Sequence, residues 1–186
     1  MRAYSCLNLQ IFEYGDYYIR TVQDSHIESI RTWRNAQIEV LRQNSPIEPK
    51  KQIEYFETNI WPTMTQSFPS NILVSFFKMN ELIGYGGLVH IVWEHASAEI
   101  SFLLSPDRIK DKTVYSEDFT AFLHLIKQMA FKDIRIRHLF TETYDIRPLH
   151  ISILESNGFT CKEILQGHVR IKNEDINSIF HECLNQ

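Results

Sequence analysis

The feature that most constrains the fold is a block of three apolar runs in the middle of the chain. These runs are Asn71–Met79, Leu82–Trp93 and Ala98–Ser105. They are rich in β-branched and aromatic residues, which favour strands. The dipeptide Asn80-Glu81 indicates a hairpin between the first two runs, and Pro106 closes the third. The block therefore predicts three consecutive strands.

Apolar residues at helical spacing lie on both sides of this block. The first set follows a cap at Asp24 or Ser25, and the second follows Pro49 and ends before Pro62. The first set is Ile27, Ile30, Trp33 and Ala36, and the second is Ile53, Phe56 and Ile60. After a polar loop at 106–114, helices are predicted over Tyr115–Phe131 and Pro148–Asn157, with Gly158 as the stop of the second.

Further strands are predicted towards both ends of the chain. Residues 5–22 form two short strands around Tyr14-Gly15-Asp16, and Ile134–Tyr144 forms a strand between the last two helices. The tail, Phe159–Cys183, forms two or three strands with a turn at 172–175. This order predicts one α+β domain over residues 1–186, with a mixed sheet and helices on its faces.

Composition excludes several classes of protein. The 186 residues carry a formal charge of −4, which disfavours nucleic acid as the main partner but leaves room for local basic pockets. The three cysteines match no zinc motif, so no metal is expected. No signal peptide or run long enough to span a bilayer is visible, and we expect a soluble cytoplasmic protein without a membrane partner.

Three stretches together resemble one family. They are Ile30–Asn35, the run Ala98–Pro106 leading into 107–113, and Ile153–Phe159. Their order resembles the GCN5-related N-acetyltransferase (GNAT) superfamily, whose members move an acyl group from acyl-CoA to an amine. The resemblance implies a mostly antiparallel central sheet with splayed central strands, acetyl-CoA or another short acyl-CoA as co-substrate, and a possible homodimer.

The loop before the third predicted helix carries the cofactor part of this resemblance. In the superfamily this loop reads Gln/Arg-x-x-Gly-x-Gly/Ala and binds the CoA pyrophosphate through backbone N–H groups. Here Arg108-x-x-Asp111-x-Thr113 fits the frame, but both glycines are replaced; the alternative is a solvated loop. The implied CoA-binding residues are Phe102, Leu103, Leu104, Arg108, Ile109, Lys110, Asp111, Lys112, Thr113, Val114 and Arg147.

The resemblance also implies catalytic residues. Glu99 matches the general base of the histone acetyltransferase branch; otherwise it pairs with His95 or Arg137. His90 is a second candidate base or a core histidine, and strand alternation places it on one face with Leu88 and Val92. The Tyr that protonates the leaving thiolate is replaced by Leu154, so Tyr144 is the candidate acid, with Tyr115 as the other possibility.

A subgroup resemblance suggests the acceptor. Residues 33–35, 40–47 and 53–56 and the strand 86–93 are similar to enzymes that acylate ribosomal protein N-termini or nucleotide-linked amino sugars of surface polysaccharide pathways. Of these two groups, the enzymes that acylate amino sugars resemble this sequence more closely. The implied substrate-binding residues are Trp33, Arg34, Arg42, Gln43, Asn44 and Trp93. Core packing for Trp33 and a simple helix end for residues 42–44 are the alternatives.

Two other function classes stay open. An acidic cleft would favour a cationic acceptor, such as a protein N-terminus or an aminoglycoside, whereas a basic patch would favour a nucleotide sugar. A non-catalytic acyl-CoA-binding module is the third possibility, because the loop glycines and the Tyr are missing.

Overall fold

The structure is a computed structural model and describes residues 1–41, 43 and 45–185. The strands are β1 (Ile11–Tyr14), β2 (Tyr17–Thr21), β3 (Ile72–Lys78), β4 (Glu81–Val92), β5 (Ser97–Leu104), β6 (His138–Tyr144), β7 (Thr160–Ile171) and β8 (Glu174–Leu184). The α-helices are α1 (Ile27–Asn35), α2 (Pro49–Tyr55), α3 (Lys112–Lys127) and α4 (Pro148–Ser156). Gln23 and His26, rather than Asp24 or Ser25, form the capping box of the turn that leads into α1.

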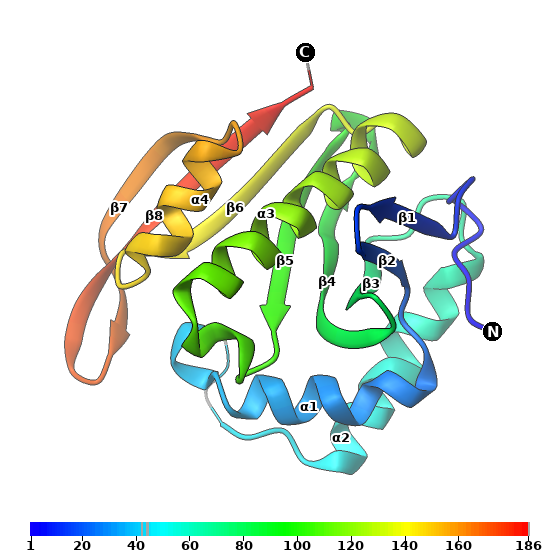
Figure 1. The fold of residues 1–186 in the computed structure, drawn as a ribbon, viewed down its shortest axis with the longest axis horizontal. Coiled ribbons are helices and arrows are strands. Elements are labelled where there is room, and N and C mark those ends of the chain that lie inside the picture. The colour runs from blue at the N-terminus through cyan, green and yellow to red at the C-terminus, as the bar shows by residue number, and fades with distance from the viewer. Residues whose placement is uncertain (42, 44, 186) are drawn as a thin grey trace.

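The strands form one sheet in the order β1-β2-β3-β4-β5-β6-β8-β7. The β5–β6 pair is parallel and the other neighbouring pairs are antiparallel. This arrangement confirms the predicted α+β class with a mixed, mostly antiparallel sheet. Figure 1 shows α3 and α4 crossing in front of the strands, while α1 and α2 gather beside the end of β5.

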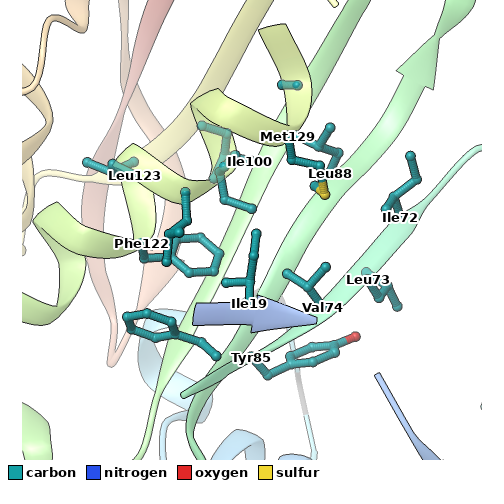
Figure 2. Close-up of a cluster of buried hydrophobic side chains, with 14 of the residues drawn as sticks. Ile19, Ile72, Leu73, Val74, Tyr85, Leu88, Ile100, Phe122, Leu123 and Met129 are labelled. Carbon is teal, nitrogen blue, oxygen red and sulfur yellow. The ribbon is translucent and has the colours of Figure 1, made fainter. Parts of the chain in front are cut away.

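The core lies between α3 and the central strands. Figure 2 shows Phe122 of α3, and Met129 of the π-helical turns that follow it, beside Leu88 and Ile100 of the sheet. A Cβ at Gly86 would lie 2.1 Å from the Ser101 carbonyl oxygen and 2.8 Å from Cζ of Phe122. Glycine is therefore required there, because a larger residue would separate β4 from both β5 and α3.

Several predicted boundaries are wrong for local reasons. Helix α3 begins at Lys112 rather than Tyr115, because Asp111 caps it from what was predicted to be loop. β6 begins at His138 rather than Ile134, since π-helical turns extend α3 through Gln128–Asp133 and Arg135 takes φ +59°. In α2, Ile53 is 47% exposed and lies off the buried face of Phe56 and Ile60.

Other element boundaries, most of them towards the two ends of the chain, can also be compared with the prediction. β1 begins only at Ile11, so residues 5–10 form no strand, and helical turns continue past Pro62 to Thr65. Gly158 has φ +83°, as expected of a residue that ends a helix. The tail forms two strands, β7 and β8, joined at Lys172 and Asn173.

Two possible features are not found in the described part of the chain. None of its helices combines the length and apolarity needed to cross a membrane. Residues 1–41, 43 and 45–185 also hold no group of three or more His, Cys, Asp or Glu side chains placed to bind a metal ion.

Candidate active site

The central feature of the site is the point where β5 and β6 separate. These strands pair from Ser97↔His138 to Glu99↔Phe140 and not beyond, although both are described throughout. Their separation confirms the predicted splay. We call the space between them, covered by residues of α3 and α4, the central cleft, and the last paired position its apex. Phe102, Thr143 and Phe119 line the cleft.

His90 and Glu99 meet at the apex. His90 Nδ1 lies 2.8 Å from Glu99 Oε2, within hydrogen-bond distance. The Glu99 side chain is 12% exposed and the His90 side chain is 67% exposed. Both line the central cleft. A buried carboxylate joined to an exposed imidazole provides a route for a proton from the cleft to solvent.

A β-bulge places His90 there. The β4–β5 register shifts between Val89 and Val92, and His90 takes φ +50°. Strand alternation is therefore interrupted, and His90 is exposed whereas Leu88 is fully buried. The prediction that His90 shares a face with Leu88 is wrong for this reason, whereas Val92 is exposed as His90 is.

The walls of the cleft contain polar groups suited to a ligand. Thr143 is 2% exposed, and its hydroxyl has no hydrogen-bond partner within the described residues. Past Glu99, β5 no longer pairs with β6. Its backbone on that side can therefore form hydrogen bonds with amide groups of a bound molecule. Tyr144 ends β6 and also lines the cleft.

A hydrogen-bonded chain forms the floor of the cleft. Arg147 Nη2 donates to the Tyr115 hydroxyl at 2.9 Å, and that oxygen lies 2.7 Å from His150 Nδ1. Burial, reinforced by Arg147 and His181, lowers the pKa of His150 well below its usual value. Burial raises the pKa of Tyr115 despite the opposing charge of Arg147. Both side chains are therefore neutral near pH 7.

The role of His150 escaped the sequence analysis. Its ring stacks on Phe119 at 4.1 Å, and Phe119 stacks on Phe102 at 4.5 Å. The sequence did contain one signal for His150. It lies four residues before Leu154, the position compared with the family tyrosine, so the two residues share one face of α4.

The segment Asp107–Val114, which runs into the first turn of α3, has several of its predicted ligand groups engaged within the chain; we call it the α3 loop. Arg108 binds the fully buried Asp118 through Nε at 2.5 Å and Nη2 at 2.9 Å. Lys110 Nζ lies 2.5 Å from Asp107 Oδ1.

Asp111 caps α3 directly. Its Oδ1 accepts the backbone N–H groups of Thr113 at 2.8 Å and Val114 at 3.1 Å. Lys112 opens α3, and Ile109 is 37% exposed. Leu103 and Leu104 are buried, and the Leu104 carbonyl oxygen accepts from Gln37 Nε2 at 2.8 Å. Of the predicted CoA residues, Phe102 and Arg147 line the central cleft.

The predicted acceptor residues are distributed unequally. Arg34 lines the central cleft, and its Nε donates to Gln43 Oε1 at 3.2 Å. Trp33 packs against the core, and the Trp93 indole donates to the Pro69 carbonyl oxygen at 2.8 Å. Neither tryptophan is among the described residues that line the central cleft. Arg42 and Asn44 lie outside the described residues.

Arg34 also lines a second pocket, between α2 and the sheet, which we call the α2 pocket. Lys51, Tyr55 and Tyr85 line it with Arg34, together with the buried Gln52. Among its described lining residues two are cationic and none is acidic. The sequence analysis missed Lys51 as a site residue because it appeared only as one of two adjacent helical lysines.

Comparisons with known proteins agree on the fold. A spermidine N-acetyltransferase from Vibrio cholerae in complex with CoA and spermine superposes with a TM-score of 0.77 at 15% identity, covering 92% of this chain and 96% of that one. A probable acetyltransferase superposes with a TM-score of 0.71 at 14% identity, covering 94% and 97%. Among curated protein sequences, none matches significantly.

The family follows from the sequence match. The family model described as the acetyltransferase (GNAT) domain matches residues 19–180, which include both sides of the central cleft. Members of this family use acetyl-CoA, so the predicted kind of acyl donor, an acyl-CoA, is confirmed. The chain therefore belongs to the GNAT family and is an acyl-CoA-dependent N-acyltransferase.

Proposed function

We propose that this enzyme transfers an acetyl or other short acyl group from acyl-CoA to the amine of a nucleotide-linked amino sugar. The observation that carries the proposal is the position of Arg34, which lines both the central cleft and the α2 pocket. An acceptor with its amine at the apex can thus extend past Arg34 into a pocket that also contains Lys51. Two cations with no acidic lining residue among those described suit a phosphate better than a polyamine.

The α2 pocket also suits the other parts of such a substrate. Tyr55 is 46% exposed and offers an aromatic face for stacking by a nucleotide base. Gln52 is 4% exposed and supplies an amide that can pair with hydroxyl or base atoms.

The proposed reaction is direct transfer. The amine nitrogen attacks the thioester carbonyl carbon, the new C–N bond forms and the C–S bond breaks. The amine proton passes to the Glu99–His90 pair, and Tyr144 gives its proton to the departing thiolate. Backbone N–H groups near Phe102–Leu104 stabilise the negative oxygen that develops on the carbonyl.

A cationic acceptor is the second candidate, and one observation favours it. Glu99 and Glu142 both line the central cleft, and carboxylates attract ammonium groups. The structural relatives from Vibrio cholerae act on spermidine, which has this chemistry. A protein N-terminus or an aminoglycoside would use the same carboxylates.

The test is release of free thiol from acetyl-CoA with a panel of acceptors: UDP- and dTDP-linked amino sugars, the free amino sugars, spermidine, an aminoglycoside and an N-terminal peptide. We expect turnover with a nucleotide-linked sugar. Turnover with spermidine, the aminoglycoside or the peptide alone would replace the proposal by the second candidate. No turnover with any acceptor would make binding without catalysis the better description.

A pair of neighbouring variants sharpens the assay. Lys51→Ala is expected to raise KM for the nucleotide-linked sugar about tenfold, the value of one charge-assisted hydrogen bond to phosphate. KM for the free sugar should not change. Lys50→Ala is the matched control, since Lys50 is adjacent on α2 but does not line the α2 pocket. Equal effects of the two variants would contradict the assigned phosphate site.

A further inference from the structure

We propose that this enzyme recognises its acyl donor through the pantetheine arm and the thioester, and that Asp111 makes it nearly indifferent to the pyrophosphate. The proposal concerns the donor and does not depend on which amine is acylated. It rests on a contrast between the central cleft, where β5 has an unpaired backbone edge past Glu99, and the α3 loop, where Arg108 and the first N–H groups of α3 already have partners in the chain.

The geometry of the cleft fixes where each part of the donor must lie. The proton-accepting pair is at the apex, so the reacting thioester must reach the apex. β5 runs from the apex to Leu104, and the α3 loop follows directly. An arm that extends along β5 from the apex therefore brings any attached pyrophosphate to the mouth of the cleft, beside the α3 loop.

The N-terminus of α3 is blocked by the chain's own carboxylate. A helix N-terminus attracts phosphate through its backbone N–H groups and its dipole. Here Asp111 accepts the N–H groups of Thr113 and Val114 and places a negative charge where phosphate oxygens would bind. A pyrophosphate would have to displace this cap or lie next to it against charge repulsion.

The strongest cation of the loop is also committed elsewhere. The Asp118 side chain is fully buried, with Arg108 as its ionic partner and the Tyr17 hydroxyl donating to it at 3.0 Å. Moving Arg108 to a phosphate would leave a buried charge unpaired, which is strongly unfavourable. Lys110 pairs with the exposed Asp107 and can move at little cost, and the exposed Lys112 opens α3, but mobile surface lysines provide limited affinity.

The central cleft is better suited to hydrogen-bond the pantetheine arm. β5 has an open backbone edge past Glu99, and the buried Thr143 hydroxyl has no partner in residues 1–41, 43 and 45–185. The amide groups of pantetheine are the part of the donor that can pair with the β5 backbone edge, next to the buried Thr143. The contrast therefore assigns donor recognition to the cleft rather than to the α3 loop.

The experiment is calorimetric titration of the full chain with CoA, pantetheine and 3′,5′-ADP. For the wild type we expect CoA to bind no more than about tenfold tighter than pantetheine, because only the mobile surface lysines Lys110 and Lys112 are available to the phosphates. Binding of 3′,5′-ADP should be too weak to measure. If CoA instead binds 100-fold or more tighter than pantetheine (about 2.7 kcal/mol), the proposal is overturned.

Two variants of Asp111 separate charge from capping. Asp111→Gly removes both, and we expect CoA to bind about tenfold tighter while pantetheine binding stays constant. Asp111→Asn keeps a good cap and removes only the charge, so its effect on CoA should be smaller. Asp107→Asn is the control, since it removes a nearby exposed carboxylate that accepts no N–H of α3. An Asp107→Asn effect equal to that of Asp111→Gly, or no change in Asp111→Gly, would contradict the role of Asp111.

Thermal unfolding shows whether Asp111→Gly remains folded. If it does not, Asp111→Asn carries the test, since asparagine is among the best N-caps. Tighter CoA binding in that variant supports the proposal, and unchanged binding of both CoA and 3′,5′-ADP contradicts it.

Discussion

The apex of the central cleft and the α3 loop follow each other along the chain, yet they use their polar residues in opposite ways. At the apex, a β-bulge turns His90 outward to meet Glu99 in the cleft. In the α3 loop, Arg108 and Asp111 turn inward to Asp118 and to the start of α3. A charged residue at a family motif position can therefore serve either a substrate or the fold, and its partners decide which.

The largest expected effect is at the apex. Glu99→Gln removes the buried carboxylate of the pair that we propose accepts the amine proton, and we expect kcat/KM to fall on the order of 100- to 1000-fold. Glu94→Gln, an exposed change on the turn before β5, is the control. If steady-state thiol release showed a change of only a few-fold for Glu99→Gln, the apex would not be the catalytic end of the cleft.

In the α3 loop we expect a cost in stability instead. Arg108→Ala leaves Asp118 charged, buried and without its ionic partner, and should lower the free energy of unfolding by about 3 kcal/mol in urea denaturation. Adding Asp118→Asn should recover much of this loss, because the buried charge is then removed. A normal unfolding curve with a large rise in KM for acetyl-CoA would instead make Arg108 a donor ligand.

The hydrogen-bonded chain of Arg147, Tyr115 and His150 predicts a pH dependence. Burial holds the pKa of His150 well below 6.5, so the folded protein resists a proton that the unfolded chain accepts. The contribution of neutral His150 to the free energy of unfolding should be fully present above about pH 6.5 and should decrease as the pH falls below it. His26, His124 and His181 have lowered pKa values for the same principal reason, and add to the slope.

His150→Phe tests this assignment. The phenyl ring keeps the stack on Phe119 but does not titrate. The free energy of unfolding of this variant should therefore depend less steeply on pH than that of the wild type. Chemical denaturation between about pH 5 and 7 measures both slopes. Identical slopes would mean that His150 does not contribute.

The smallest effect is expected at Lys110. Its pair with Asp107 is exposed on both sides, so Lys110→Ala should change the free energy of unfolding by less than about 0.5 kcal/mol. KM for acetyl-CoA should rise less than about threefold, as for loss of one mobile surface cation. A tenfold rise would show that the α3 loop binds the pyrophosphate after all.

The sequence predicted the fold class, and it named His90 and Glu99, which the structure brings together, for identifiable reasons. Strand runs and helical spacing are local signals, and Glu99 stands in a recognisable strand. The bulge at His90 was not predictable, because it depends on pairing between β4 and β5 rather than on the residues of β4 alone.

Partners distant in the sequence were equally hidden. Arg108 appeared as a phosphate ligand because its carboxylate, Asp118, is found only once α3 has formed and packed. His150 meets Tyr115 across two helices that are 35 residues apart at this contact. Arg34 and Lys51 share a pocket only because α1 and α2 pack together.

The short β5–β6 pairing has a consequence for how the molecule folds. β1 to β5 form one half of the sheet, and β6, β8 and β7 form the other; three residue pairs and the crossing helix α3 connect them. Closing the loop between Glu99 and Phe140 gains only three residue pairs, fewer than any other neighbouring pair of strands described in the sheet. We expect the seam between the halves to be the last part of the sheet to assemble, and since the cleft proposed to be catalytic is that seam, recovery of activity should report the final step of refolding.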